Sequence, residues 1–374
     1  MKMSNPPLVM IYADAKPVVR VGKIAKTLTH MGYQINFWGW DRHRRYPDRF
    51  VQDGMDHRMI LHGGGESNKS LAFMYPLWAL KVFLHLLRKR PSLVYAANLD
   101  TAFPCALASF LYPLKFIYDN HDTYYMRYLV PSPIIWILKM VERFTLRRSN
   151  WVFLPDENRM TRIERPYAPK TTVIYNCPED VPPTATGTDQ RPFTVFLSGY
   201  LREDRGTRLL LQAARQMGEL RILAAGNIPD PNLEQEIRAH RQVDFRGYLP
   251  LWEALALCHQ VDLIFTFYDP KRELNRHAAS NKWYDAMMAG KPILVNSEVL
   301  NAQWIAQEDI GYLCPYGDVQ ALVNCLRHIS QHKEEALRKG QKGRRLFETK
   351  YDWPNMEKRL RNVFSAVFGT GDRT

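Results

Sequence analysis

The sequence predicts an α/β protein made of two domains, each built around a parallel β-sheet. Short apolar strands alternate with helical patterns along the first half, a turn-rich segment follows Ile174, and the alternation then restarts. Strands that alternate with helices at this spacing form parallel sheets covered by helices on both faces. The length of 374 residues fits two domains of ordinary size.

The first half begins with apolar strands and with helices that end at glycine or proline. The helix expected at Val19–Met31 is closed by Gly32, and the helix at Ala79–Arg90 ends at Pro91. The remaining expected elements are strands at Leu8–Tyr12, Gln34–Gly39, Leu93–Ala96 and Lys115–Asp119, and a helix at Ile134–Leu146.

The second half repeats this alternation after a linker. Residues 176–187 combine proline, glycine, threonine and acidic residues, which is typical of a connection between domains. Strands are then expected at Thr194–Ser198, Leu220–Ala225, Val243–Arg246, Asp262–Thr266 and Ile293–Asn296. Helices are expected at Arg208–Met217, Leu251–Cys258, Asp318–Gln331 and Asn355–Phe368, with one more that opens at Ser280.

The chain is basic, with a formal net charge of +13. Three kinds of partner match such a charge: nucleic acid, an anionic membrane surface and phosphorylated small molecules. The sequence lacks the aromatic-rich strand motifs of an RNA-recognition fold, zinc-finger spacings and heptads, so nucleic acid is the partner we expect least. Basic and aromatic residues cluster at 40–46, 88–90 and 143–148, which favours contact with an anionic membrane surface.

The cysteines and the apolar runs indicate a cytoplasmic protein. The five cysteines are scattered without the paired spacing of a zinc site, which also points to a reducing compartment. Leu8–Ala13 is too short for the core of a secretory signal. The apolar run from Ala102 to Leu114 is shorter than the roughly 20 residues of a membrane-spanning helix. We expect a cytoplasmic protein that is peripheral on the cytoplasmic membrane face.

The helix that opens at Ser280 carries the most specific chemistry. Its free backbone N–H groups can hold an anion, and Lys282 can meet a diphosphate. Asp285, in the second turn, can accept hydrogen bonds from the hydroxyls of a ribose. Phosphate at the start of a helix and a carboxylate for ribose together predict a nucleotide-sugar site.

A second phosphate-binding pattern lies between a strand and a helix, in residues 198–206. Gly199 lets the backbone approach a phosphate, and Arg202 and Arg205 supply charge for a diphosphate. This loop and the helix from Ser280 resemble those of family-4 glycosyltransferases of the GT-B fold. In the family a basic residue commonly stands where Tyr200 stands here, and Arg205 keeps the second basic position.

The resemblance implies further donor-binding residues. It places Tyr248 near the nucleotide base, and backbone amides around Ala279 and Ser280 near phosphate or sugar hydroxyls. The family commonly has two glutamates on this segment, and their positions hold His277 and Asp285 here. The departure at His277 implies a different sugar-binding loop.

The first domain carries the residues expected on the acceptor side. His121 follows the strand at Lys115–Asp119, and ligands of α/β sheets bind at the carboxyl ends of strands. In the family a histidine at this place lies near the transferred sugar, so His121 is a catalytic candidate together with Arg205 and Lys282. Asn98, Asp100 and Arg20 are the acceptor-binding candidates, Arg20 as a phosphate ligand.

The resemblance implies a GT-B fold of two Rossmann-like domains with parallel sheets facing a central cleft. We expect an acceptor domain at 1–177, a linker at 178–192, a donor domain at 193–350 and a C-terminal helix at 351–374 that can pack back on the first domain. The implied reaction is a retaining transfer of a hexosyl group from a nucleoside-diphosphate sugar to an acceptor hydroxyl. The expected acceptor is a lipid-linked glycan in surface polysaccharide synthesis.

Protein cations are expected to do the work of a metal, since no Asp-x-Asp triplet suited to Mg²⁺ occurs. We therefore expect no metal site and no cofactor beyond the donor. Two alternatives stay open at this point. One is a sugar-nucleotide epimerase, which shares the architecture, and the other is a catalytically silent scaffold that binds membrane or a partner.

Overall fold

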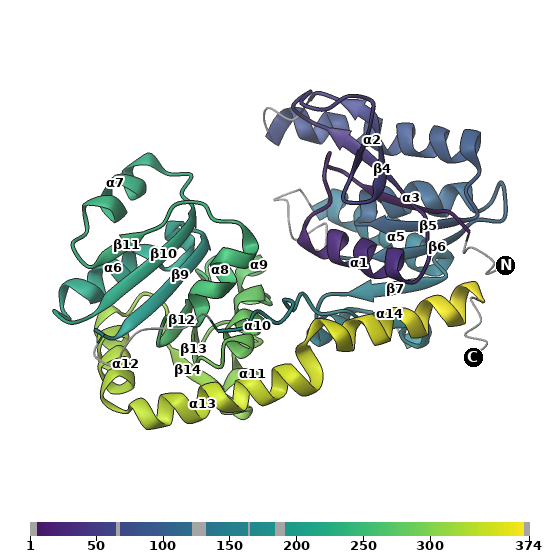
Figure 1. Ribbon diagram of the computed structural model, residues 1–374. Coiled ribbons are helices and arrows are strands. Elements are labelled where there is room, and N and C mark those ends of the chain that lie inside the picture. Colours follow the sequence, from purple (N-terminus) through teal and green to yellow (C-terminus); the bar gives the residue numbers. More distant parts are fainter. Residues whose placement is uncertain (1–5, 65–67, 122–131, 164, 184–190, 370–374) are drawn as a thin grey trace. The chain divides into compact units, whose positions relative to one another are not determined.

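The computed structural model describes residues 6–64, 68–121, 132–163, 165–183 and 191–369, and the chain forms two compact units (Figure 1). Unit 1 comprises Met1–Tyr175 and Met356–Thr374, and unit 2 comprises Asn176–Asn355. The chain therefore crosses between the units twice. Within the predicted linker at 178–192, residues 184–190 lie outside the described residues.

Unit 1 contains an eight-stranded sheet in the order β3-β4-β2-β1-β5-β6-β7-β8. All neighbouring strands are parallel except β3 and β4, which form an antiparallel pair at one edge. The strands are β1 (Leu8–Tyr12), β2 (Ile35–Asp41), β3 (Arg49–Gln52), β4 (Met55–His62), β5 (Leu93–Ala97), β6 (Lys115–Asp119), β7 (Trp151–Leu154) and β8 (Thr171–Val173). Strands β5 and β6 are almost wholly buried, as expected for the centre of a parallel sheet.

The helices of unit 1 form two groups. Helices α2 (Asn68–Lys89), α3 (Leu99–Ala108) and α5 (Ser132–Arg148) lie next to one another. The second group pairs α1 (Val19–His30) with α14 (Trp353–Phe368), where the Thr27 hydroxyl donates to Glu357 at 3.0 Å. The ring of Phe364 also packs on Tyr33 with centroids 5.4 Å apart. Two 3₁₀-helices, η1 (Glu157–Arg162) and η2 (Arg165–Lys170), precede β8.

Unit 2 contains a six-stranded, wholly parallel sheet in the order β11-β10-β9-β12-β13-β14. The strands are β9 (Thr194–Tyr200), β10 (Arg221–Asn227), β11 (Val243–Phe245), β12 (Leu263–Thr266), β13 (Ile293–Asn296) and β14 (Gly311–Cys314). The helices are α6 (Thr207–Arg215), α7 (Pro231–Ala239), α8 (Leu251–Cys258), α9 (Glu273–Arg276), α10 (Asn281–Met288), α11 (Ala302–Gln307), α12 (Val319–Gln331) and α13 (Lys333–Leu346). A 3₁₀-helix, η3 (Glu203–Arg205), precedes α6, and a π-helical turn, η4 (Phe347–Tyr351), follows α13.

The two-domain α/β prediction is confirmed, and the predicted strands occur at or within two residues of their expected positions. One antiparallel pair, the β3–β4 hairpin, is added at the edge of the otherwise parallel sheet of unit 1. Helix α3 fills most of the apolar run that was too short for a membrane span, and Pro104 lies inside it. No helix in the described parts of the chain is both long and apolar enough to cross a membrane.

Candidate active site

Glycines shape the carboxyl ends of three neighbouring strands in unit 2. Gly226 in β10 lies directly beside Gly199 in β9, so a Cβ added to Gly226 would sit 1.9 Å from the carbonyl oxygen of Gly199. Its N–H donates to the carbonyl oxygen of Gly247, just after β11, at 2.8 Å. Gly199 itself has φ of +93°, in the region that favours glycine. At these glycine positions the carboxyl ends of the strands therefore expose backbone that a ligand can approach closely.

Helix α10 begins beside this glycine edge. A Cβ on Gly199 would lie 3.3 Å from Nζ of Lys282, in the first turn of the helix. The indole N–H of Trp283 donates to the Thr266 hydroxyl at 2.9 Å and fixes the helix to β12. Ser280, the N-cap, is buried, and its hydroxyl has no hydrogen-bond partner in the structure. The start of α10 thus offers an unused hydroxyl and a lysine next to open backbone.

Arg205 ends η3 and reaches toward the loop before α10. Its Nη1 donates to Oδ1 of Asn275 at 3.0 Å, and its guanidinium lies 4.4 Å from the ring centroid of Tyr268. Asn275 is itself buried and donates to the carbonyl oxygen of Asp269 at 3.0 Å. These partners are neutral, and neither Arg205 nor Lys282 has an ion pair within the described residues. Two positive charges therefore stand uncompensated near the same strand ends.

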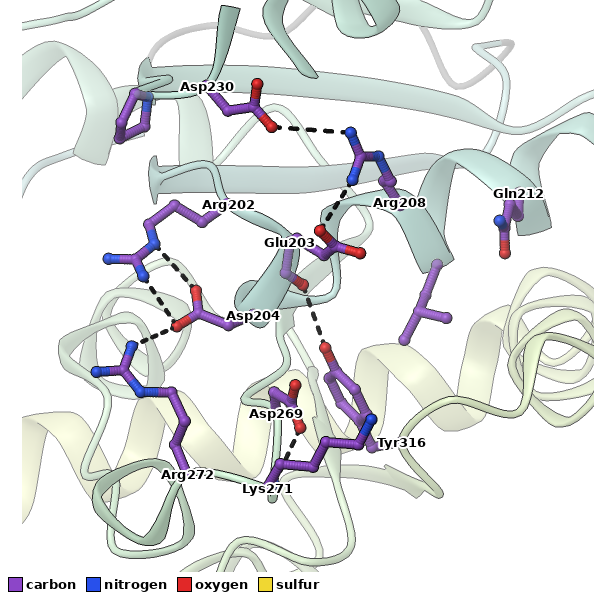
Figure 2. Close-up of a pocket in the computed structure, with 12 residues that line it drawn as sticks. Arg202, Glu203, Asp204, Arg208, Gln212, Asp230, Asp269, Lys271, Arg272 and Tyr316 are labelled. Carbon is purple, nitrogen blue, oxygen red and sulfur yellow. Dashed lines mark hydrogen bonds and ion pairs between the residues drawn. The ribbon is translucent and has the colours of Figure 1, made fainter. Parts of the chain in front are cut away.

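A hollow of about 760 Å³ is lined in part by residues that follow β9 and β12 (Figure 2). Arg202 and Arg272 both donate to Asp204, at 3.2 and 2.9 Å. Arg208 donates to Glu203 at 2.9 Å and lies 3.7 Å from Asp230. Figure 2 shows these arginines directed at carboxylates. A phosphate entering the hollow would have to displace these carboxylates, whereas Arg205 and Lys282 have no carboxylate partner within the described residues.

The remaining predicted donor residues are spread along this edge of unit 2. Tyr248 follows Gly247 and is 83% exposed. His277 caps the end of α9 and is half-buried, as is Ala279 two residues later. Asp285 is half-buried in α10. The pKa of Cys258 in α8 is raised first by the burial of its thiol and next by the negative charge of Asp285. Asp285 therefore lies near α8. Among the predicted donor residues, Arg202 lines the hollow of Figure 2, where it is paired with Asp204, and it does not lie beside Lys282.

In unit 1, a buried carboxylate organises the surroundings of His121. The ring Nε2 of His121 lies 2.9 Å from Asp119 at the end of β6. Arg20 donates to the same carboxylate at 2.8 Å, and the Tyr95 hydroxyl donates to it as well. Burial raises the pKa of Asp119, but the charges of Arg20 and His121 more than offset this and hold that pKa well below its usual range. Burial and the charge of Asp119 raise the pKa of Tyr95.

The three predicted acceptor-binding residues take different positions in unit 1. Arg20 is buried and also donates to the carbonyl oxygen of Ile174, so its guanidinium supports Asp119 from the interior. Asn98 has φ of +73° at the start of α3, and its buried Oδ1 has no hydrogen-bond partner in the structure. Asp100 accepts from the indole N–H of Trp78 at 3.1 Å. Only Asn98 therefore leaves a polar atom unused, and the acceptor roles stay predictions.

Asp119 and Tyr95 contact the residues of this site but were not among the predicted site residues. Asp119 ends a buried strand two residues before His121, a signal that could have identified it. Tyr95 lies in the middle of β5, which reads as an ordinary core strand. Among the described residues no group of three or more His, Cys, Asp or Glu side chains could hold a metal ion.

In comparisons with known proteins, each unit matches a family model of glycosyl transferases. Residues 17–177 match the model of the glycosyl transferase 4-like domain, and residues 191–332 match the model of glycosyl transferases group 1. A comparison with curated proteins finds no match.

Solved structures share the whole fold. Sucrose-phosphate synthase from Thermosynechococcus elongatus is 16% identical with a TM-score of 0.78, over 98% of this chain and 100% of that one. HepE from Anabaena, solved in complex with UDP, is 16% identical with a TM-score of 0.69, over 96% and 100%. A putative UDP-N-acetylglucosamine 2-epimerase from Listeria monocytogenes is 11% identical with a TM-score of 0.66, over 99% and 98%. At these identities the likeness shows the fold alone, and it extends over both units.

Proposed function

Because the chain is a glycosyltransferase of the GT-B fold that uses a nucleotide-sugar donor, we propose that unit 2 holds the donor diphosphate between Arg205, Lys282 and the start of α10. The observation that carries the proposal is the uncompensated charge of Arg205, whose partners Asn275 and Tyr268 are neutral. A diphosphate supplies the missing negative charge, and the unused Ser280 hydroxyl gives it one more donor.

The proposed reaction is a retaining transfer of a hexosyl group. As the glycosidic C–O bond stretches, negative charge builds on the departing diphosphate, and cations fixed beside it stabilise the transition state more than the ground state. The acceptor hydroxyl attacks from the face that the diphosphate leaves. Because Arg205 and Lys282 do this work, we expect the activity to survive EDTA. We assign His121 and Asn98 to the acceptor side, His121 held in place by Asp119.

The test compares two lysines of unit 2. A thermal-shift panel with UDP, GDP, dTDP and ADP identifies the nucleotide, which should stabilise the fold by about 2.7 kcal/mol at 100 times its dissociation constant. Lys282→Ala removes one charge-assisted contact and should raise that constant by about 10- to 100-fold. Lys271→Ala is the matched control, because Lys271 lines the hollow of Figure 2. Loss of binding in Lys271→Ala with normal binding in Lys282→Ala would move the donor site into the hollow.

Product analysis separates the proposed transferase from its alternatives. Release of free nucleoside diphosphate only when an acceptor is present marks a transferase, whereas interconversion of the donor without acceptor marks an epimerase. Nucleotide binding without either reaction, with a panel of acceptors, would identify a silent scaffold.

A membrane-associated, lipid-linked acceptor in surface polysaccharide synthesis is the substrate class we propose. The support is a patch of exposed apolar side chains on α5 and just after α3, here named the α3–α5 patch. Its members are Phe110, Leu111, Ile134, Trp136, Ile137 and Met140, which are 43% to 65% exposed. Phe110 stacks on Phe144 of α5 at 5.8 Å, which joins the two helices, and the guanidinium of Arg148 lies 4.1 Å from the Phe110 ring. Apolar side chains beside cations suit an anionic lipid surface.

Sedimentation with anionic vesicles tests this patch. Trp136→Glu places a negative charge in the patch and should abolish most of the binding to vesicles. Trp252→Glu in α8 of unit 2 is the matched control, since both tryptophans are 65% exposed. Equal vesicle binding by the two variants would remove the α3–α5 patch as the membrane contact.

A further inference from the structure

A second cavity, of about 430 Å³, lies in unit 1 at the end of the sheet opposite to His121. It is bounded by residues at or near the amino ends of the parallel strands β1, β2, β4 and β5, whereas His121 follows the carboxyl end of β6. The cavity is thus separate from every residue assigned above to the donor or the acceptor.

Four cationic side chains and one carboxylate line this cavity. Arg49 comes from β3, Arg58 from β4, and Lys89 and Arg90 from the end of α2, while Asp56 is the single acidic residue. Neither the Arg49 nor the Arg58 side chain makes a hydrogen bond or an ion pair within the described residues. The cavity therefore concentrates positive charge that the protein itself does not neutralise.

The strand pairing makes this excess of charge unfavourable without a ligand. Arg49 and Arg58 are directly opposite each other in the antiparallel β3–β4 pair, and like charges in that position repel. Trp38 is opposite Arg58 on the other side, in β2, so the three side chains lie in one row on the same face of the sheet. Trp38 is in turn packed by His85 of α2, with ring centroids 5.8 Å apart, which fixes the end of α2 near this row.

We infer that this cavity binds a phosphate-bearing organic anion, with Arg49 and Arg58 on the phosphate. Paired guanidinium groups match the geometry of phosphate oxygens, and an anion between them turns their repulsion into attraction. The apolar part of the wall, formed by Pro7, Val9, Trp38 and Pro91, leaves room for an organic group beside the phosphate. The volume exceeds what a bare phosphate fills and lies in the usual range of small-molecule sites.

The ligand has two sources with the same chemistry, a soluble phosphate compound and a lipid headgroup. Exposed leucines at 77, 80 and 84 form a stripe along α2, the helix that ends at Lys89. A phospholipid could therefore present its headgroup to the cavity while these leucines meet its acyl chains. The experiment has one arm for each source.

Calorimetric titration of the full-length protein with inorganic pyrophosphate tests the site, with UDP present in saturating amount to occupy the donor site. We expect one binding event in the wild type and at least a 10-fold weaker one in Arg58→Gln and in Arg49→Gln. Arg241→Gln, which removes an exposed arginine of unit 2, is the matched control and should bind as the wild type does. An unchanged melting shift with UDP shows that each variant is folded.

Equal pyrophosphate binding by Arg58→Gln and Arg241→Gln would overturn the inference, as would the absence of any binding event in the wild type. Vesicles of phosphatidic acid form the second arm. Displacement of pyrophosphate by these vesicles supports the site with a lipid headgroup as its ligand. Retention of pyrophosphate supports the site with a soluble phosphate compound.

Discussion

The two candidate sites, around Asp119 in unit 1 and around Arg205 in unit 2, treat their charges in opposite ways. In unit 1, Asp119 is fully buried and receives Arg20, His121 and Tyr95, so a carboxylate in the interior is surrounded by donors. In unit 2, Arg205 and Lys282 have no carboxylate partner within the described residues, and the groups around Arg205 are neutral. A closed, paired cluster holds a side chain in place, whereas an unpaired cation is available to a ligand. The contrast predicts that loss of Asp119 acts first on stability, whereas loss of Arg205 acts first on turnover.

Asp119→Ala should have the largest effect. It leaves Arg20 charged in the interior without its partner, which costs about 3–5 kcal/mol of the free energy of unfolding. Hydrogen exchange of the β6 amides measures this locally, because two-unit proteins do not unfold in one step. Asp204→Ala is the control, since Asp204 also receives two arginines but these are about half exposed, and it should cost no more than about 1 kcal/mol. Equal losses would remove the contrast.

Arg205→Ala should be next in size and should act on the reaction instead. Loss of one fixed cation at the leaving diphosphate is expected to lower kcat by about 100- to 1,000-fold, as for other preorganised charges. The free energy of unfolding should fall by less than in Asp119→Ala, by about 1–3 kcal/mol, because Arg205 has no ion pair and its loss leaves one buried neutral acceptor, Oδ1 of Asn275, without its donor. Steady-state kinetics and urea unfolding on the same preparation check both halves. A large loss of stability with intact kcat would show that Arg205 is structural.

Low pH should destabilise unit 1 around Asp119, with a smaller effect than either substitution. Because the pKa of Asp119 is lowered in the folded state, its contribution to stability is fully present above its unfolded value of about 3.9 and is lost as the pH falls below that. The protection factors of the β6 amides, corrected for the intrinsic pH dependence of amide exchange, should therefore fall below about pH 4, and this dependence should be weaker in Asp119→Asn. An identical acid response in the two proteins would assign the acid sensitivity to other groups.

Much of the fold could be predicted because it depends on local pattern. Runs such as Leu93–Ala97 are apolar, short and bounded by turn residues, and each became a buried strand. The β3–β4 hairpin was not predicted because its strands carry arginine, aspartate and histidine. Helix α13 was not predicted because it is rich in lysine and arginine. The hydrophobic periodicity that identifies core strands and helices is weaker in charged edge strands and in exposed helices.

The candidate site was predictable only in part, for a related reason. The helix from Ser280 was visible because its cap, lysine and aspartate are close in sequence. The pairing of Arg205 with Asn275 joins residues 70 positions apart, and that of Arg20 with Asp119 joins residues 99 apart. Whether an arginine is paired or unpaired decides its role, and that depends on the fold. Arg20 and Arg205 look alike in the sequence and occupy opposite situations in the structure.

The double crossing of the chain has a consequence for biosynthesis. Unit 2 is one uninterrupted stretch, whereas unit 1 needs Met356–Thr374 to complete it, including Leu360 and Phe364, which are fully buried. A ribosome therefore delivers all of unit 2 before it delivers the last helix of unit 1. The usual order, in which the N-terminal domain finishes folding first, is reversed. The half of the enzyme that begins synthesis is the half that matures last, and a chain that stops short of residue 356 would leave it without its closing helix.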